Sequence, residues 1–206
     1  MNGMTQAMRT IMALSGAAGL AGCVVAVGNE SASNATSGAP RAAGVEVSEQ
    51  RLPTDVRRST IIVRDIENSL KLYRDVIGLV VNYDTTVTTS GVALPAGEPG
   101  ATARLVLLNA NDPWVGWVGL MEWIEPAIPA QDYPRRMGPG DVVMVLNTDD
   151  VEGRCKAAKA VPGVTFTAEP RLQVYPGRDG GPDIRVMGCN FFDPDGILIE
   201  LNQILD

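Results

Sequence analysis

The spacing of apolar and polar positions predicts a strand followed by a helix near residue 60. Residues 59–65, STIIVRD, are a short apolar run that ends in an acid, which is typical of a buried strand. In residues 66–77 the apolar side chains return every three or four positions, so they fall on one face of a helix. Asp65 is placed to cap this helix and Gly78 to end it.

The same pattern returns 85 positions later. Residues 142–150, VVMVLNTDD, predict a second strand, and residues 151–161 predict a second helix. Asp150 is placed to cap this helix, and Gly163 lies just beyond its end. Because the capping acids and the terminating glycines are separated by the same number of positions, the pattern indicates an internal duplication.

Three more strands are predicted after each helix, so each copy is a βαβββ module. These strands are predicted at 79–84, 102–109, 115–124, 164–168, 183–192 and 197–203. The predicted boundaries are 57–125 for the first module, 126–139 for a proline-rich linker and 140–206 for the second module, which together form one folded domain of residues 57–206. Glycine- and proline-rich stretches at 85–100 and 169–182 are predicted to be loops over a pocket.

The N-terminal segment has a different pattern. Residues 8–23 place one arginine before a short apolar stretch that ends in small residues, as in a secretory signal peptide. Leu20-Ala21-Gly22-Cys23 is similar to the lipobox of bacterial lipoproteins, so we expect residues 1–22 to be a lipoprotein signal peptide and Cys23 to be lipidated. An ordinary cleaved signal or a buried N-terminal helix is the alternative. Residues 23–56 lack an apolar period and are expected to form a disordered tether. The protein would then be exported and anchored at the periplasmic face of a bacterial membrane.

Composition excludes several classes of function. The 206-residue chain has a formal net charge of −7, which argues against a nucleic-acid partner. It contains no histidine, so Ser-His-Asp and Cys-His catalysis are excluded, and the commonest ligand of zinc and iron is missing. Cys155 and Cys189 lie in an export-compatible domain, where a disulfide is permitted. The sequence does not pair them, and buried packing is the expected role.

Two segments resemble a known family. TIIVRDIENSLKLYRDVIGLVVNYD, residues 60–84, followed by FFDPDGILIELNQ, residues 191–203, is similar to the vicinal oxygen chelate superfamily. That superfamily includes glyoxalase I, extradiol dioxygenases and the bleomycin resistance proteins. The resemblance covers residues 57–203 and implies an α+β fold in which two paired βαβββ modules form a curled mixed sheet around a cleft. It also implies inward-facing metal ligands and a homodimer.

The metal ligands of that superfamily are matched only in part. The resemblance places a ligand, usually histidine, seven residues before each capping acid, where this chain has Arg58 and Val143. The closing-strand glutamate corresponds to Glu200 and, less directly, to Glu122. Two carboxylates without nitrogen ligands make a poor transition-metal site, so we expect no metal and no other cofactor. A metal-dependent glyoxalase or dioxygenase is the less favoured hypothesis, which would need further acids such as Asp183 or a site built of oxygen ligands alone.

The period of two along a strand predicts which side chains share the cleft. If Glu200 faces inward, Leu198 and Asn202 face inward with it. The rest of the predicted inward set is Arg58, Thr60, Ile62, Leu120, Glu122, Val143, Val145 and Asn147. The residues expected to contact a ligand are Arg58, Thr60, Trp117 at the loop mouth, Glu122, Val143, Asn147 and Asn202.

Glu200 therefore has two roles open. If Arg58, Glu122 and Glu200 converge, the guanidinium would bind a ligand carboxylate and one acid would hold its proton more tightly, as a general base does. The structural alternative is an ion pair that borders a binding cleft or faces solvent. We expect a lipid-anchored protein that binds a small organic molecule in the cleft between its modules, with a metal-free acid–base lyase or isomerase using Glu200 as the alternative.

Overall fold

The computed structural model describes residues 54–132 and 136–205. The predicted signal peptide, the predicted lipidation site at Cys23 and most of the predicted tether lie outside the described residues. None of the helices in the described part of the chain is long and apolar enough to cross a membrane.

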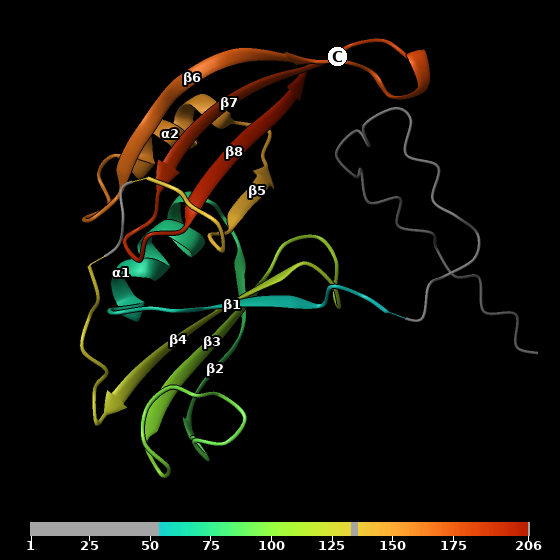
Figure 1. The fold of residues 1–206 in the computed structure, drawn as a ribbon. Helices are drawn as coiled ribbons and strands as arrows, with labels where there is room; N and C mark the ends of the chain where they lie inside the picture. Colours follow the sequence, from blue (N-terminus) through green and yellow to red (C-terminus); the bar gives the residue numbers. More distant parts are fainter. Residues whose placement is uncertain (1–53, 133–135, 206) are drawn as a thin grey trace, which may run out of the picture. The chain divides into compact units, whose positions relative to one another are not determined.

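The first module is a four-stranded mixed sheet, sheet A, with one helical segment (Figure 1). Its strands are β1 (Arg58–Ile62), β2 (Val80–Thr88), β3 (Thr102–Asn109) and β4 (Trp117–Glu125), in the order β1-β4-β3-β2. β1 runs parallel to β4, and the other pairs are antiparallel. The helix α1 (Ile66–Leu70) continues directly into the π-helical turn η1 (Lys71–Val76).

The second module repeats this arrangement as sheet B, in the order β5-β8-β7-β6. Its elements are β5 (Val143–Asn147), α2 (Val151–Ala158), β6 (Thr165–Tyr175), the short 3₁₀ helix η2 (Arg178–Gly180), β7 (Ile184–Phe192) and β8 (Leu198–Leu205). The parallel pair is again the first strand with the last. The predicted α+β class and the two βαβββ modules are therefore confirmed, although the strands form two separate sheets and not one curled sheet.

Strand β6 is longer than the sequence predicts. The predicted strand ends at 168 and is followed by a loop, whereas the strand pairs with β7 as far as Tyr175. The register shifts between Ala168 and Arg171, so that Glu169 and Pro170 lie in a bulge. A bulge tolerates a proline because the residue there leaves the ladder of hydrogen bonds. The predicted loop at 169–182 is therefore wrong for its first half.

The N-terminus of each helix is capped by two side chains, one of which comes from the sheet of the same module. Asp65 Oδ1 accepts from Asn68 N at 3.0 Å and Asp150 Oδ1 accepts from Gly153 N at 2.9 Å, so both predicted caps are confirmed. A second cap comes from the last strand of each module. Ile66 N donates to Glu122 Oε2 at 2.9 Å, and Val151 N donates to Gln203 Oε1 at 3.4 Å.

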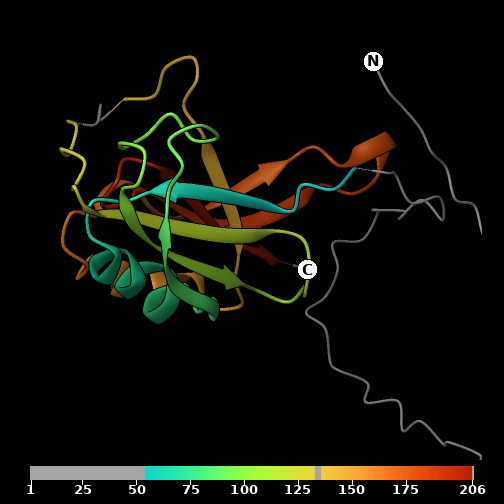
Figure 2. The same cartoon turned by 90° about the horizontal axis from the view of Figure 1, so that it is seen from below.

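The two modules share one apolar core, made by both helical segments and the sheet faces beneath them. The helical segment η1 of the first module packs against α2 (Figure 2), and Arg154 Nη1 of α2 donates to the carbonyl of Val76 at 2.7 Å. The turn between β7 and β8 is anchored on the first module as well, because Tyr73 donates its hydroxyl to Asp193 Oδ2 at 2.7 Å. Burial raises the pKa of the Asp193 carboxyl above its ordinary value, while the hydrogen bond from Tyr73 acts in the opposite direction. The Asp193 carboxyl therefore links the second module to Tyr73 of the first.

A disulfide between Cys155 and Cys189 ties α2 to β7. The two Cα atoms are 6.5 Å apart, and both side chains are buried in the common core. Both cysteines are therefore buried, as expected. The sequence alone left open whether they form a disulfide, and the structure shows that they do.

Candidate functional site

The open face of each sheet, defined as the face turned away from the helices, is where the sequence places the candidate site. In β8, Ile199 and Leu201 are fully buried in the common core. Because alternate residues of a strand point to opposite faces, Leu198, Glu200 and Asn202 lie on the open face of sheet B. This orientation agrees with the prediction.

A cluster of polar side chains surrounds Glu200 on that face. Asn202 Nδ2 donates to Glu200 Oε1 at 2.9 Å, and Asn190 lies directly opposite Glu200 in the pairing of β7 with β8. Gly188 lies opposite Asn202, and a Cβ added there would clash with Asn202 Oδ1 and lie 3.0 Å from Gln173 Nε2. The side chains of Asn202 and Gln173 therefore occupy the space over Gly188.

Two polar atoms in this cluster have no partner in the described part of the chain. Asn202 Oδ1 is a buried acceptor and Gln173 Nε2 is a buried donor, and neither makes a hydrogen bond there. The orientation of each amide is fixed by its other hydrogen bond. Asn202 Nδ2 donates to Glu200, and Gln173 Oε1 accepts from Tyr175 Oη at 2.7 Å. Leaving a buried polar group unpaired costs about 1–3 kcal/mol. Such atoms mark the open face of sheet B as a place where a ligand with matching groups would be stabilised.

Strand β5 borders this cluster, and the residues it contributes are those that the sequence predicts to face inward. Val143, Val145 and Asn147 pair with Leu198, Glu200 and Asn202 in parallel register, so all of them share the open face. Val143 and Val145 are exposed over 43% and 57% of their surface. The cluster is therefore flanked by apolar surface that is not covered within the described residues.

The open face of sheet A has a different residue at the position of Glu200. Val145 pairs with Glu200 in sheet B, and Thr60, which lies 85 positions before Val145, pairs with Gly119. Gly119 is therefore the counterpart of Glu200. A Cβ on Gly119 would lie 2.7 Å from Thr60 Oγ1, so the threonine side chain fills the space that a larger residue would need.

Glu122 does not face the predicted cleft. Thr60 and Gly119 share one face of sheet A, so Leu120 and Glu122, which are out of phase with Gly119, lie on the helix face. Leu120 is fully buried in the common core, and Glu122 accepts a hydrogen bond from Ile66 N at the start of α1. The predicted inward orientation of these two residues is wrong. The acid caps a helix, as Gln203 does in the second module.

Arg58 and Trp117 face each other at the start of the parallel pair in sheet A. Trp117 is 9% exposed and donates its indole N–H to the carbonyl of Asp112 at 3.1 Å. Arg58 is exposed, and among the described residues no hydrogen bond or ion pair joins it to Glu122 or Glu200. The predicted convergence of Arg58, Glu122 and Glu200 is therefore not found.

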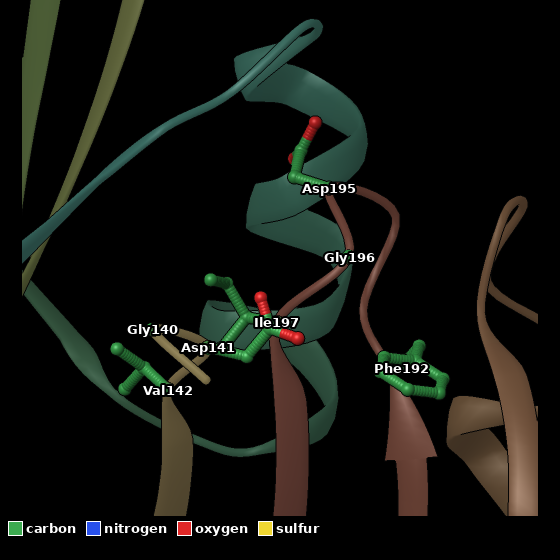
Figure 3. Close-up of a pocket in the computed structure, with 7 residues that line it drawn as sticks. All are labelled: Gly140, Asp141, Val142, Phe192, Asp195, Gly196 and Ile197. Atoms are coloured by element: carbon green, nitrogen blue, oxygen red, sulfur yellow. The ribbon is translucent and has the colours of Figure 1, made fainter. Parts of the chain in front are cut away.

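Two hollows lie away from Glu200. The smaller, of about 190 Å³, is lined by Gly140, Asp141, Val142, Phe192, Asp195, Gly196 and Ile197 (Figure 3). Figure 3 shows Asp195 pointing toward the helix of the first module. Its carboxylate accepts from Arg64 and from Ser69 Oγ, which makes it a structural contact between modules. The larger hollow, of about 540 Å³, lies beside Trp123 and the linker.

No group of three or more cysteine, aspartate and glutamate side chains in residues 54–132 and 136–205 is arranged to hold a metal ion. The side chains that the register and the hydrogen bonds place beside Glu200 on its own face are the amides of Asn202 and Asn190, and amide oxygens are weak metal ligands beside carboxylate or imidazole. The residues present do not fit the metal site that the family resemblance implies.

Comparisons with known proteins agree with this architecture. The model of the family described as Glyoxalase/Bleomycin resistance protein/Dioxygenase superfamily matches residues 56–201. No curated protein matches the chain. A glyoxalase family protein from Bacillus cereus has a solved structure that is 16% identical, with a TM-score of 0.58, and the match covers 78% of this chain and 100% of that one.

Two other solved structures match with lower scores. A glyoxalase/bleomycin resistance protein/dioxygenase family enzyme from Burkholderia phytofirmans is 15% identical over 74% of this chain and 100% of its own, with a TM-score of 0.45. The fosfomycin resistance protein FosX from Listeria monocytogenes, complexed with Mn(II) and sulfate, is 16% identical over 74% and 93%, with a TM-score of 0.41. At these identities the likeness concerns the fold alone.

Proposed function

Because the chain belongs to the Glyoxalase/Bleomycin resistance protein/Dioxygenase superfamily, we propose that it binds a small organic molecule on the open face of sheet B, around Glu200. The observation that carries this proposal is the pair of unpartnered buried atoms, Asn202 Oδ1 and Gln173 Nε2, beside the Glu200 carboxylate. With the Glu200 carboxylate, these two atoms provide two acceptors and one donor on a face flanked by Val143 and Val145. A ligand with a polar head and an apolar body matches this surface.

The ligand's polar head would carry hydrogen-bond donors and at least one acceptor. Its donors would face Glu200 and Asn202 Oδ1, and its acceptor would face Gln173 Nε2. A protonated amine, an amide or a hydroxyl-bearing group satisfies this arrangement, whereas a second carboxylate would meet Glu200 with like charge. The earlier expectation of a ligand carboxylate at Arg58 is not carried forward, since Arg58 lies on the other sheet.

A thermal-shift screen of small amines, amides and polyols tests the proposal, because a ligand stabilises the folded state by mass action. We expect at least one of these compounds to raise the melting temperature of the wild-type chain, and Glu200→Gln to reduce that shift by weakening binding about tenfold. Glu98→Gln, at an exposed side chain outside the cluster, is the matched control. A compound that stabilises both variants equally binds elsewhere, and a screen without any such compound would contradict the proposal.

A metal-free acid–base lyase or isomerase is the second candidate. The observation that favours it is the hydrogen bond from Asn202, which orients the Glu200 carboxylate through one oxygen and leaves Oε2 without a partner among the described residues. A general base needs such an oriented carboxylate within reach of the proton it removes. Once a ligand is found, Glu200→Gln should abolish its turnover if Glu200 is the base, and should only change affinity if the face is a binding site. Elemental analysis of the purified protein tests the metal-dependent alternative, for which stoichiometric zinc, nickel, iron or manganese would be required.

We further propose that the protein is exported and carries a lipid on Cys23, which anchors it at the periplasmic face of a bacterial membrane. The Cys155–Cys189 disulfide supports export, because such bonds persist in oxidising compartments. Cys23→Ala should move the protein from the membrane to the soluble fraction. A homodimer is proposed from the family resemblance, and light scattering would detect it.

A further inference from the structure

The larger hollow has its own walls, all from the first module and the linker. It is named here the linker hollow, and its volume is about 540 Å³. Its lining comprises Ile62, Val63 and Arg64 after β1, Pro95, Ala96 and Gly97 of the β2–β3 loop, Glu122 and Trp123 of β4, and Ala127, Ile128, Pro129, Ala130 and Gln131 of the linker. None of these residues belongs to sheet B, so the linker hollow is distinct from the Glu200 cluster.

The size and the walls of the linker hollow suit a small organic molecule. Ligand pockets typically enclose about 300–1,000 Å³ and are mostly apolar, with a few polar groups that orient the ligand. Here the apolar walls are contributed by isoleucine, proline and alanine side chains and by the Trp123 ring. Trp123 itself is fixed in place, since it packs in a second apolar cluster with Ala103 and Met121 beneath the loop.

The Trp123 indole N–H is an unpaired donor at this hollow. Trp123 is 3% exposed, and Nε1 has no hydrogen-bond partner in the described part of the chain. The backbone of Gly97 lies against Nε1, so that a Cβ at Gly97 would clash with it. A tryptophan in a protein interior usually finds an acceptor for its N–H, and leaving it unpaired costs about 1–3 kcal/mol. An acceptor on a ligand would remove that cost if the loop shifts slightly at Gly97, a residue with a φ of +68°.

The charges at the hollow favour a neutral occupant. Arg64 and Glu122 contribute one positive and one negative group, and both already make contacts within the protein. Arg64 Nε donates to Asp195 Oδ1 at 3.1 Å, and Glu122 Oε2 accepts from Ile66 N at 2.9 Å. A charged ligand would be attracted by one of these groups and repelled by the other, while paying the cost of leaving water. A neutral molecule avoids both effects.

We propose that the linker hollow binds a neutral, mostly apolar organic molecule whose carbonyl oxygen accepts a hydrogen bond from the Trp123 indole N–H. The site is independent of the Glu200 cluster and does not rest on the proposed function. Its occupant enters between the β2–β3 loop and the linker, and it becomes pinned at one end by the indole.

The probe is prodan, a neutral naphthalene ketone whose emission moves to shorter wavelength in apolar surroundings and to longer wavelength when its carbonyl accepts a hydrogen bond. The full-length chain carrying Cys23→Ala is used, so that no lipid is attached and no detergent is needed. We expect saturable binding of one prodan per chain with a blue-shifted emission. Ala130→Trp, which fills the hollow from an exposed linker position, should weaken binding at least tenfold.

Trp123→Phe removes the donor and keeps the ring. It should weaken prodan binding about fivefold, which is the value of one ordinary hydrogen bond, and should shift the bound emission further to the blue. Trp114→Phe, at an exposed tryptophan outside the hollow, is the matched control and should bind prodan as the parent chain does. Thermal unfolding checks that each variant folds. If Trp123→Phe does not fold, Ala130→Trp still tests the proposal.

Val145→Asp separates this site from the Glu200 cluster, because it places a charge on the open face of sheet B. Unchanged prodan binding in this variant supports the linker hollow, whatever becomes of the proposed function. Prodan binding that survives Ala130→Trp, or that is lost in Val145→Asp, would overturn the proposal.

Discussion

The open faces of the two sheets differ at the same structural position. In sheet B the centre holds Glu200, whose carboxylate accepts from Asn202. In sheet A the corresponding Gly119 has no side chain, and Thr60 fills the space over it. Since the first module folds with glycine there, an acid at this position is not a requirement of the fold. The acid is therefore specific to the second module, as a group that binds a ligand on that face alone would be.

The devices that hold the backbone are shared by both modules. Glu122 and Gln203, which lie 81 positions apart, each accept from the first N–H of the helix in their own module. Asp112 and Asp193 have the same separation, each precedes a proline, and the Oδ1 of each accepts backbone N–H groups within its own turn. Duplicated modules thus keep caps and turns while the open faces diverge.

The disulfide gives the largest expected difference between the modules. In the first module Leu70 lies at the position of Cys155, and the strand register places Val106 at the position of Cys189; both are buried and apolar. Replacing both cysteines by alanine should lower the free energy of unfolding by about 3–4 kcal/mol, because the bond closes a loop of 34 residues in the unfolded chain. Urea unfolding of the purified protein measures this change.

Reductant provides the control for that experiment. It should destabilise the wild-type protein by a similar amount and leave the double alanine variant unchanged. A wild-type protein that unfolds at the same urea concentration with and without reductant would show that the second module depends on packing alone, as the first does.

Moving the acid to the first module should have the next largest effect. Gly119→Glu places a side chain against Thr60 and a carboxylate on a buried position, so we expect a loss of about 3 kcal/mol in the free energy of unfolding. Thr60→Ala in the same chain should recover about 1 kcal/mol of that loss. Glu200→Gln is the matched change in sheet B and should alter stability by less than about 0.5 kcal/mol. If Gly119→Glu is as stable as the wild type, Thr60 does not fill the space over Gly119.

The sequence predicted the local features well because their causes are local. The caps at Asp65 and Asp150 depend on neighbours three residues away, and β3 has the predicted bounds of 102–109. The orientation of Glu122 depends instead on how β4 is aligned with β1. The residue types around Glu122 resemble those around Glu200. However, the pairing of Thr60 with Gly119 places Glu122 on the opposite face of its sheet.

The same limit applies to the length of β6 and to the candidate site. The bulge at Pro170 is stabilised by pairing with β7, a strand more than ten residues away, so the strand's continuation to Tyr175 has no local signal. For that reason the sequence did not predict Gln173 as part of the candidate site, because a residue predicted to lie in a loop cannot be assigned to one face of a sheet. The alternation of polar and apolar residues from Arg171 to Tyr175 is the one signal that could have placed it on the open face.

The smallest expected effects test the shared caps. Glu122→Ala removes a charged acceptor at 2.9 Å from the helix N-terminus, where a negative charge is favourable, and should cost about 1–2 kcal/mol of unfolding free energy. Gln203→Ala removes a neutral acceptor at 3.4 Å, close to the limit of a hydrogen bond, and should cost about 0.5 kcal/mol. Glu122→Gln keeps the acceptor without the charge and should fall between them. Urea unfolding in low and high salt separates the charge from the hydrogen bond, because salt screens only the former. An alanine at 122 that leaves stability intact would mean that α1 is held by its apolar face alone, and Glu122 would then have to be reconsidered as a ligand-binding acid at the linker hollow.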